Sequence, residues 1–125
     1  GLGRPDVAVE PARRRVDERH DCLVGSLLVG AGTALHRVVA LGCDYYESQA
    51  SIDAHEKAGQ PRVGIGTNCR IENAIIDKNA RIGNNVVISP AGKPAHYDAP
   101  LELYYIRDGI VVIPKGASIP DGTVI

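Results

Sequence analysis

The sequence predicts an all-β domain folded as a left-handed parallel β-helix of hexapeptide repeats, with two insertions. Two observations carry this prediction. Isoleucine recurs about every six residues, a period that belongs neither to the α-helix nor to a single strand. Glycine, asparagine, aspartate and proline fill the positions between, where they can form tight corners. Three short strands and three corners then make a triangular coil, and stacked coils bury the isoleucines in columns.

The repeat frame is clearest in the second half of the chain. Its leading residues, with spacings of 6, 5, 6 and 6, are Ile65, Ile71, Ile76, Ile82 and Ile88. The frame resumes at Ile113, Ile119 and Ile125, and "VGAGTA" carries it upstream from Val29 to Leu35. A small or branched residue follows four positions after each leading residue: Thr33, Cys69, Ile75, Ala80, Val86, Ala117 and Thr123.

A single hexapeptide would not be stable on its own. Ordering six backbone residues costs on the order of 6–12 kcal/mol, whereas one buried isoleucine returns only about 1.5–3 kcal/mol. Hydrogen bonds and stacking between neighbouring coils must therefore supply the remaining stability, as in other solenoids.

Two segments lack the six-residue repeat, and we expect them to form insertions at about residues 43–62 and 89–105. The first is polar and favours a short helix over "SIDAHEKA", residues 51–58; the second contains three prolines and reads as a loop. Residues 1–21 carry five arginines and no hexapeptide phase. We therefore expect a disordered segment at 1–21, unmatched to the repeat, before a β-helix domain at 22–125. The missing initiator methionine favours a fragment or a processed chain.

Composition argues against several classes of protein. The net charge of -1 gives no overall electrostatic attraction to nucleic acid or to a membrane surface. No apolar run reaches the roughly 20 residues of a membrane span, and neither a signal peptide nor a transit peptide is visible. Cys22, Cys43 and Cys69 are far apart without a CxxC pair, which argues against a disulfide scaffold or a zinc site and favours a reducing compartment.

Two lysines stand out as a candidate anion site. Lys78 and Lys115 each occupy the second position after a leading isoleucine, in "IDK" and "IPK", where a side chain points outward. Arg81 and Arg107 lie near the same elements and are weaker candidates. The alternative is an ordinary solvated face. Exposed ion pairs give about 0–1 kcal/mol each, whereas micromolar binding needs about 8 kcal/mol, so another domain or subunit would have to add donors.

No catalytic or metal-binding set emerges from the other polar residues. Hexapeptide acyltransferases use a histidine base in a cleft between coils, and His20, His36, His55 and His96 are the possible bases here. None has an acidic partner nearby in sequence, and their scattered spacing does not suit zinc. The carboxylates of the first insertion, Asp44, Glu47, Asp53 and Glu56, are expected to solubilise it.

Three segments carry a resemblance to a known family: "LGCDYYES", "VGIGTNCRIENAIIDKNARIGNNVVI" and "YYIRDGIVVIPKGASIPDGTVI". Over residues 23–125 the chain resembles the C-terminal domain of plant-type ADP-glucose pyrophosphorylase (glucose-1-phosphate adenylyltransferase). "DYYES" and "IRDGIVVI" are more similar to the large, regulatory subunit than to the small one. Residues 26–42 are shorter than the family pattern.

The resemblance implies a subunit of a plastid heterotetramer that makes ADP-glucose and pyrophosphate from ATP and glucose 1-phosphate for starch synthesis. It implies that the β-helix packs on a nucleotidyltransferase domain, contacts other subunits, and helps bind 3-phosphoglycerate and orthophosphate. The family's effector lysines fall on Lys78 and Lys115. The resemblance assigns Mg²⁺ and ATP to the family's nucleotidyltransferase domain, whose motifs are not among these 125 residues, so we expect the chain alone to be inactive.

Two other functions remain open from the sequence. The chain could be a trimeric hexapeptide acyltransferase that binds acyl-coenzyme A between coils, which requires a histidine directed into a cleft beside a neighbouring coil. It could also be a truncated product without a function of its own.

Overall fold

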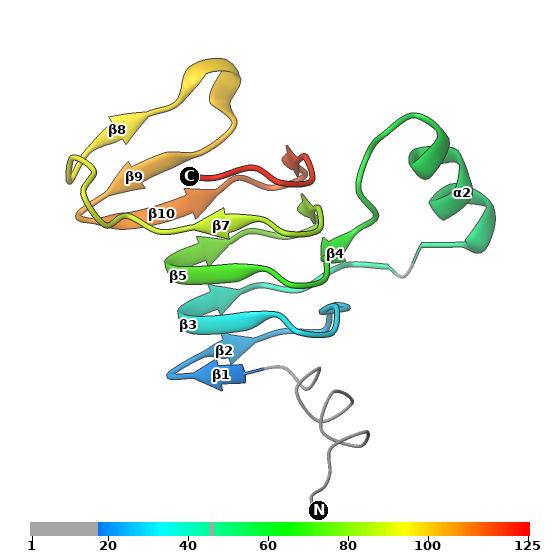
Figure 1. Cartoon of the computed structure of the whole chain (residues 1–125), viewed down its shortest axis with the longest axis horizontal. Helices are drawn as coiled ribbons and strands as arrows, with labels where there is room; N and C mark the ends of the chain where they lie inside the picture. The colour runs from blue at the N-terminus through cyan, green and yellow to red at the C-terminus, as the bar shows by residue number, and fades with distance from the viewer. Residues whose placement is uncertain (1–17, 46) are drawn as a thin grey trace, which may run out of the picture.

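The computed structural model describes residues 18–45 and 47–125, and it shows short strands stacked in successive coils (Figure 1). The main coil strands are β1 (Glu18–His20), β2 (Leu23–Val24), β3 (Ala34–Ala40), β4 (Gly64–Ile65), β5 (Arg70–Ile76), β6 (Arg81–Ile82), β7 (Val87–Ile88), β10 (Ile110–Ile113) and β11 (Ser118–Ile119). These strands form two parallel sheets. In the larger sheet β1, β3, β5 and β10 follow one another, with β2 beside β3 and β7 beside β5; the smaller sheet has the order β11, β6, β4. The prediction of a parallel β-helix is confirmed.

The isoleucines of the repeat form columns inside the coils. Leu35, Ile71 and Ile88 occupy equivalent positions on β3, β5 and β7, and all three are fully buried. A second column joins Ile65, Ile82 and Ile119, and a third joins Ala40, Ile76 and Ile113. The core therefore runs along the axis of the solenoid, and each coil adds one residue to each column.

One position departs from the six-residue frame. Several residues four positions after a leading residue are buried, but on β5 Ala74 is buried and Ile75 faces outward. The cause is the five-residue spacing from Ile71 to Ile76. Asn73 turns the chain with a φ of 47°, which puts the corner before Ala74. Val38 and Val111 align with Ala74 on the neighbouring strands and are buried in the same way.

Asparagine and glycine form the corners, as predicted. Gly32, Asn68, Asn85 and Gly122 lie at equivalent corners of successive coils, joined by backbone hydrogen bonds. Their φ angles of 77°, 56°, 59° and 74° are in the left-handed region. Asparagine tolerates this region better than other side chains, and glycine adopts it freely.

The first insertion contains the predicted helix, α2 (Gln49–Lys57), which projects from the coils (Figure 1). Ser48 caps its start by accepting a hydrogen bond from the Ser51 N–H at 3.2 Å. The second insertion is more ordered than the loop that was predicted. It contains β8 (Tyr97–Asp98) and a short 3-10 helix (Pro100–Glu102), and it ends in β9 (Tyr105–Arg107).

These strands of the second insertion run antiparallel: β9 pairs with β10, and β8 pairs with β9. Asp108 and Gly109 form the two-residue turn between β9 and β10, with φ angles of 52° and 74°. The six-residue pattern did not predict this antiparallel pairing, because it identifies β10 only as a strand of a coil.

The domain also begins earlier than residue 22. Residues 18–20 were predicted to lie in a disordered segment outside the repeat, yet they form β1 and pair with β3. The side chains of β1 are exposed, so the strand carries no aliphatic signal. Residues 1–17 lie outside the described part of the chain. Among the residues described, no helix has the length and apolarity to cross a membrane.

Candidate anion site at the corner of two coils

Lys78 and Lys115 lie on adjacent coils, one directly above the other. Each follows a buried isoleucine, Ile76 on β5 or Ile113 on β10, and these two isoleucines are register partners. The pairing continues past the strands, because the Asp77 N–H donates to the Ile113 carbonyl and the Gly116 N–H donates to the Lys78 carbonyl, both at 2.9 Å. Neighbouring strands are about 4.8 Å apart. The backbones of the two lysines are therefore adjacent, and both side chains leave the solenoid at the same corner.

Asp44 from the first insertion completes this corner. Its Oδ1 lies 3.2 Å from the Lys78 Nζ, and its Oδ2 accepts a hydrogen bond from the Asn79 Nδ2 at 3.2 Å. The backbone N–H of Asp44 donates to the Asn79 Oδ1 at 2.9 Å, so the aspartate is held from two directions. The hydrogen bond from Asn79, then the contact with Lys78, and more weakly the charge of Lys115, lower the pKa of Asp44.

The two arginines named as weaker candidates are engaged elsewhere. The Arg81 Nη1 lies 2.9 Å from the Glu47 Oε2 and also donates to the Pro61 carbonyl at 3.0 Å. The Arg107 Nη2 lies 2.6 Å from the Asp98 Oδ1, and its guanidinium carbon lies 5.0 Å from the centre of the Tyr105 ring. Each arginine therefore already has a carboxylate partner at some distance along the chain.

Glu47 was expected only to solubilise the insertion, and that expectation is wrong. Its side chain is 5% exposed. Burial alone would raise its pKa, but the Val63 N–H, the Ser51 hydroxyl and the Arg81 guanidinium lower the pKa to about 2. Glu47 therefore holds the insertion against the coils. Nothing in the local sequence distinguishes it from a solvated carboxylate, because Val63 and Arg81 are far away along the chain.

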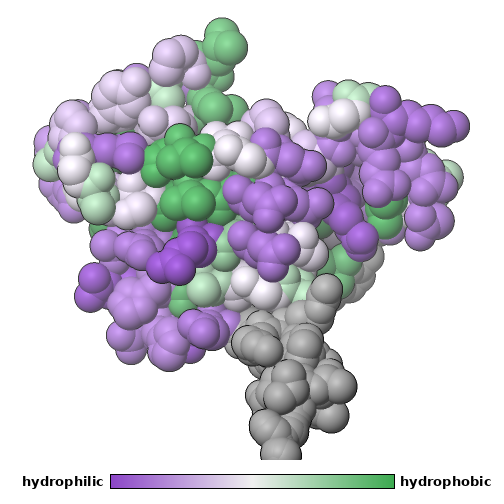
Figure 2. All heavy atoms as spheres, in the orientation of Figure 1, coloured by the Kyte–Doolittle hydropathy of each residue, from purple (hydrophilic) through white to green (hydrophobic). Residues whose placement is uncertain are grey.

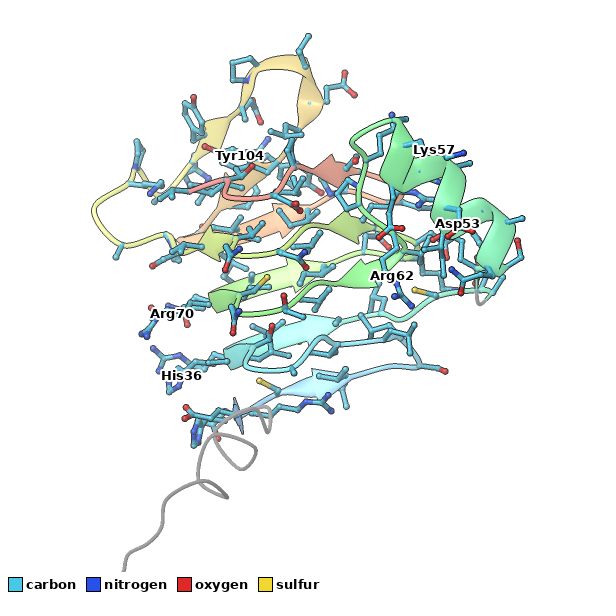
Figure 3. All side chains as sticks on the ribbon, turned by 45° about the vertical axis from the view of Figure 1, so that its right-hand side comes forward. His36, Asp53, Lys57, Arg62, Arg70 and Tyr104 are labelled. Atoms are coloured by element: carbon cyan, nitrogen blue, oxygen red, sulfur yellow. The ribbon has the colours of Figure 1, made fainter. Side chains whose placement is uncertain are left out.

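The four histidines occupy three separate places. His20 and His36 are register partners on β1 and β3 with ring centres 5.8 Å apart. They line a hollow of about 240 Å³ together with Arg70 and Glu72, and Figure 3 shows His36 and Arg70 on the same edge of the coils.

The other two histidines have acidic neighbours that the local sequence did not reveal. The His55 Nδ1 lies 3.1 Å from the Glu47 Oε2, and the His96 Nε2 lies 3.5 Å from the Asp108 Oδ1. Among the described residues no group of three or more histidine, cysteine, aspartate or glutamate side chains could hold a metal ion. Cys22, Cys43 and Cys69 are free thiols.

An apolar stripe on the outside of the larger sheet was not predicted. Leu23, Val39, Ile75 and Val112 are register partners on β2, β3, β5 and β10, and all four side chains reach the surface. A polar residue would be usual at such a position in every coil. We call these four residues the apolar stripe.

A second apolar area involves the C-terminal end. The face seen in Figure 2 is mostly hydrophilic, with a hydrophobic patch over β7 and the C-terminal segment. Val87 forms a bridge with Val124 in this part of the molecule, and Val124 is largely exposed.

Stacked hexapeptide coils with asparagine and glycine corners define the class of parallel β-helix solenoids. The chain belongs to the family of GLGC left-handed parallel β-helix domains, whose family model matches residues 15–124. This match confirms the predicted hand and family, and it also starts before the predicted boundary at residue 22.

A curated relative agrees with this assignment. The chain is 50% identical over 97 residues to glucose-1-phosphate adenylyltransferase large subunit 1, chloroplastic/amyloplastic, from Zea mays. The aligned part covers 78% of this chain and 19% of that protein, so the chain spans about a fifth of the length of the relative. The predicted resemblance to the large subunit is thereby confirmed.

Proposed function

We propose that the chain is the regulatory and assembly domain of a glucose-1-phosphate adenylyltransferase large subunit, and that it binds phosphate-bearing effectors at the Lys78–Lys115 corner. The observation that carries this proposal is the stacking of the two lysines on adjacent coils, through the hydrogen bond from Gly116 to the Lys78 carbonyl. The effectors would be 3-phosphoglycerate as activator and orthophosphate as inhibitor.

The solvent exposure of this corner favours an effector site that is shared with a second domain or subunit. Lys78 is about half exposed, so an anion there would be screened by water and bound weakly by this domain alone. Arg81 and Arg107 could bind the effector only after breaking their ion pairs with Glu47 and Asp98. A tight effector site therefore needs further basic groups from a second domain or subunit, which would cover the corner and exclude water.

The apolar stripe supports an assembly role. Exposed apolar side chains that continue across several strands are typical of surfaces covered by a partner. The partners would be a nucleotidyltransferase domain and the other subunits of a heterotetramer, located in the plastid like the maize relative, whose name places it in the chloroplast or amyloplast.

Catalysis is not assigned to the described residues. Mg²⁺ and ATP would act at the nucleotidyltransferase domain, and the described residues offer no set of ligands for a metal ion. We expect the purified chain to form no ADP-glucose from ATP and glucose 1-phosphate. Turnover above background in a coupled pyrophosphate assay would contradict this assignment.

The anion site is tested by titrating the chain with orthophosphate and with 3-phosphoglycerate while following amide chemical shifts by NMR. We expect weak, saturable shifts centred on Lys78, Asn79 and Gly116. Lys78→Ala and Lys115→Ala should each weaken binding severalfold, and the double variant should abolish it. Lys57→Ala is the matched control, because Lys57 is an exposed lysine in the last turn of α2 (Figure 3). Equal binding by the double variant and the wild type would refute the site.

A further inference from the structure

The candidate anion site already contains an anion that belongs to the chain itself. Asp44 places one carboxylate oxygen 3.2 Å from the Lys78 ammonium and the other 3.2 Å from the Asn79 amide. A bound phosphate would need the same ammonium group. An anion that binds the Lys78 ammonium would therefore compete with this carboxylate.

The position of Asp44 is built into the fold. Asn79 lies at a coil corner with a φ of 61° and joins both the backbone N–H and the carboxylate of Asp44 through its side chain. The Cys43 N–H just before it donates to the Ser26 carbonyl at 2.8 Å, and Glu47, three residues later, forms an ion pair with Arg81. The backbone of Asp44 is therefore anchored on both sides of the residue.

The contact between Asp44 and Lys78 is nevertheless easy to open. Both side chains are about half exposed, at 51% and 49%. An exposed ion pair of this kind contributes little stability and is screened by salt. The carboxylate can rotate away while the backbone stays anchored, which leaves the two lysines to an incoming anion.

We propose that Asp44 is an internal anion that competes with phosphate for the Lys78–Lys115 pair and so sets the affinity of the site. This inference rests on the proposed function, because it assumes that the lysine pair binds phosphate. A ligand must displace the carboxylate before it can contact the Lys78 ammonium. The aspartate also repels any second anion that stays nearby. Asp44 is thus an affinity-determining residue that has no contact with the bound ligand.

The test compares inorganic phosphate binding by the full 125-residue chain and by Asp44→Asn, at pH 7.5 and low salt. Asparagine is nearly isosteric and can still accept the hydrogen bond from the Asn79 amide, but it carries no charge. We expect the dissociation constant to fall about two- to fivefold, the factor that corresponds to one exposed ion pair. Raising the salt concentration should reduce the difference between the two proteins.

Three further variants make the result specific. Asp53→Asn removes one negative charge from α2, where Asp53 accepts a hydrogen bond from Gln49, and it should bind phosphate like the wild type. Asp44→Ser removes the same carboxylate with a smaller side chain, and it replaces Asp44→Asn if that variant does not fold. Lys78→Ala combined with Lys115→Ala reports whether the lysine pair binds phosphate at all.

The outcomes separate this inference from the proposed function. Tighter binding by the Asp44 variants, with Asp53→Asn unchanged, supports the competition. Unchanged or weaker binding by the Asp44 variants, while the double lysine variant loses binding, overturns the competition and leaves the anion site standing. Equal binding by the wild type and the double lysine variant, or no binding by the wild type and the Asp44 variants, refutes the anion site and the competition together.

Discussion

The Glu47 carboxylate and the Arg81 guanidinium lie 2.9 Å apart and join the first insertion to the coil that follows it. Both side chains are largely buried, with 5% and 16% exposed. Glu47 also accepts hydrogen bonds from the Val63 N–H at 2.8 Å and from the Ser51 hydroxyl at 2.7 Å. One carboxylate therefore links the start of α2, the end of the insertion and β6.

Glu47→Gln should destabilise the domain by about 2–3 kcal/mol, because a hydrogen bond to a charged group contributes about 1.5–3 kcal/mol and Arg81 would lose its carboxylate partner. Urea unfolding followed by circular dichroism measures the change. Asp53→Asn, on the exposed side of α2, is the control and should stay within about 0.5 kcal/mol of the wild type. If Glu47→Gln lowers the free energy of unfolding no more than Asp53→Asn does, the contacts of Glu47 do not contribute to stability.

Glu47 also predicts how stability depends on pH. Its pKa is lowered from 4.5 to about 2 in the folded chain. A lowered carboxyl pKa stabilises the fold fully above the unfolded pKa, and this contribution is lost as the pH falls through the folded pKa. The part of the stability gap between the wild type and Glu47→Gln that comes from the Glu47 charge should therefore shrink as the pH falls from about 4.5 to 2. Urea unfolding at pH 7, 4 and 3 tests this, and a gap that is equal at all three values would contradict it.

The periodic part of the fold could be predicted from the sequence because its cause is local. Each coil buries one large aliphatic residue per side, so positions such as Ile71 and Ile82 repeat with the period of the coil itself. The period also placed Lys78 and Lys115 outward, just after a buried isoleucine. Their adjacency needed the register between β5 and β10, and the insertion between these strands hides that register from the sequence.

The contacts of the insertions could not be predicted in the same way. Asp44 and Glu47 read as solvated carboxylates, yet their partners Lys78 and Arg81 lie more than thirty residues along the chain. The strand β1 has no buried side chain to mark it, and only its pairing with β3 assigns it to the domain. These contacts and this strand pairing depend on how the coils stack, and a local sequence pattern contains no information on the stacking.

The two faces of β5 should respond differently to truncation. Ile71 is fully buried between Leu35 and Ile88, so Ile71→Ala should cost about 2–5 kcal/mol through lost burial and the cavity left behind. Ile75 belongs to the apolar stripe and faces outward, so Ile75→Ala should cost less than about 1.5 kcal/mol in the isolated chain. Urea unfolding of the two variants gives the comparison. Similar losses for both would mean that Ile75 is not a surface residue.

Gly66 should be intolerant of any side chain, because the next coil leaves no room for a Cβ atom at this point. A Cβ atom at Gly66 would lie only 2.5 Å from the Gly83 carbonyl oxygen on the next coil. The Gly66 N–H donates to the Ile82 carbonyl at 2.9 Å, so the two backbones cannot separate without losing that bond. Gly66→Ala should therefore destabilise the fold by about 3 kcal/mol or more.

Gly92 is the matched control for this substitution. It has a φ of 74°, and a Cβ atom there would meet nothing within 4 Å, so Gly92→Ala should cost only the backbone strain of about 1–2 kcal/mol. Thermal unfolding of both variants, followed by circular dichroism, measures the difference. If Gly66→Ala melts at the same temperature as Gly92→Ala, close packing of consecutive coils is not what requires glycine at position 66.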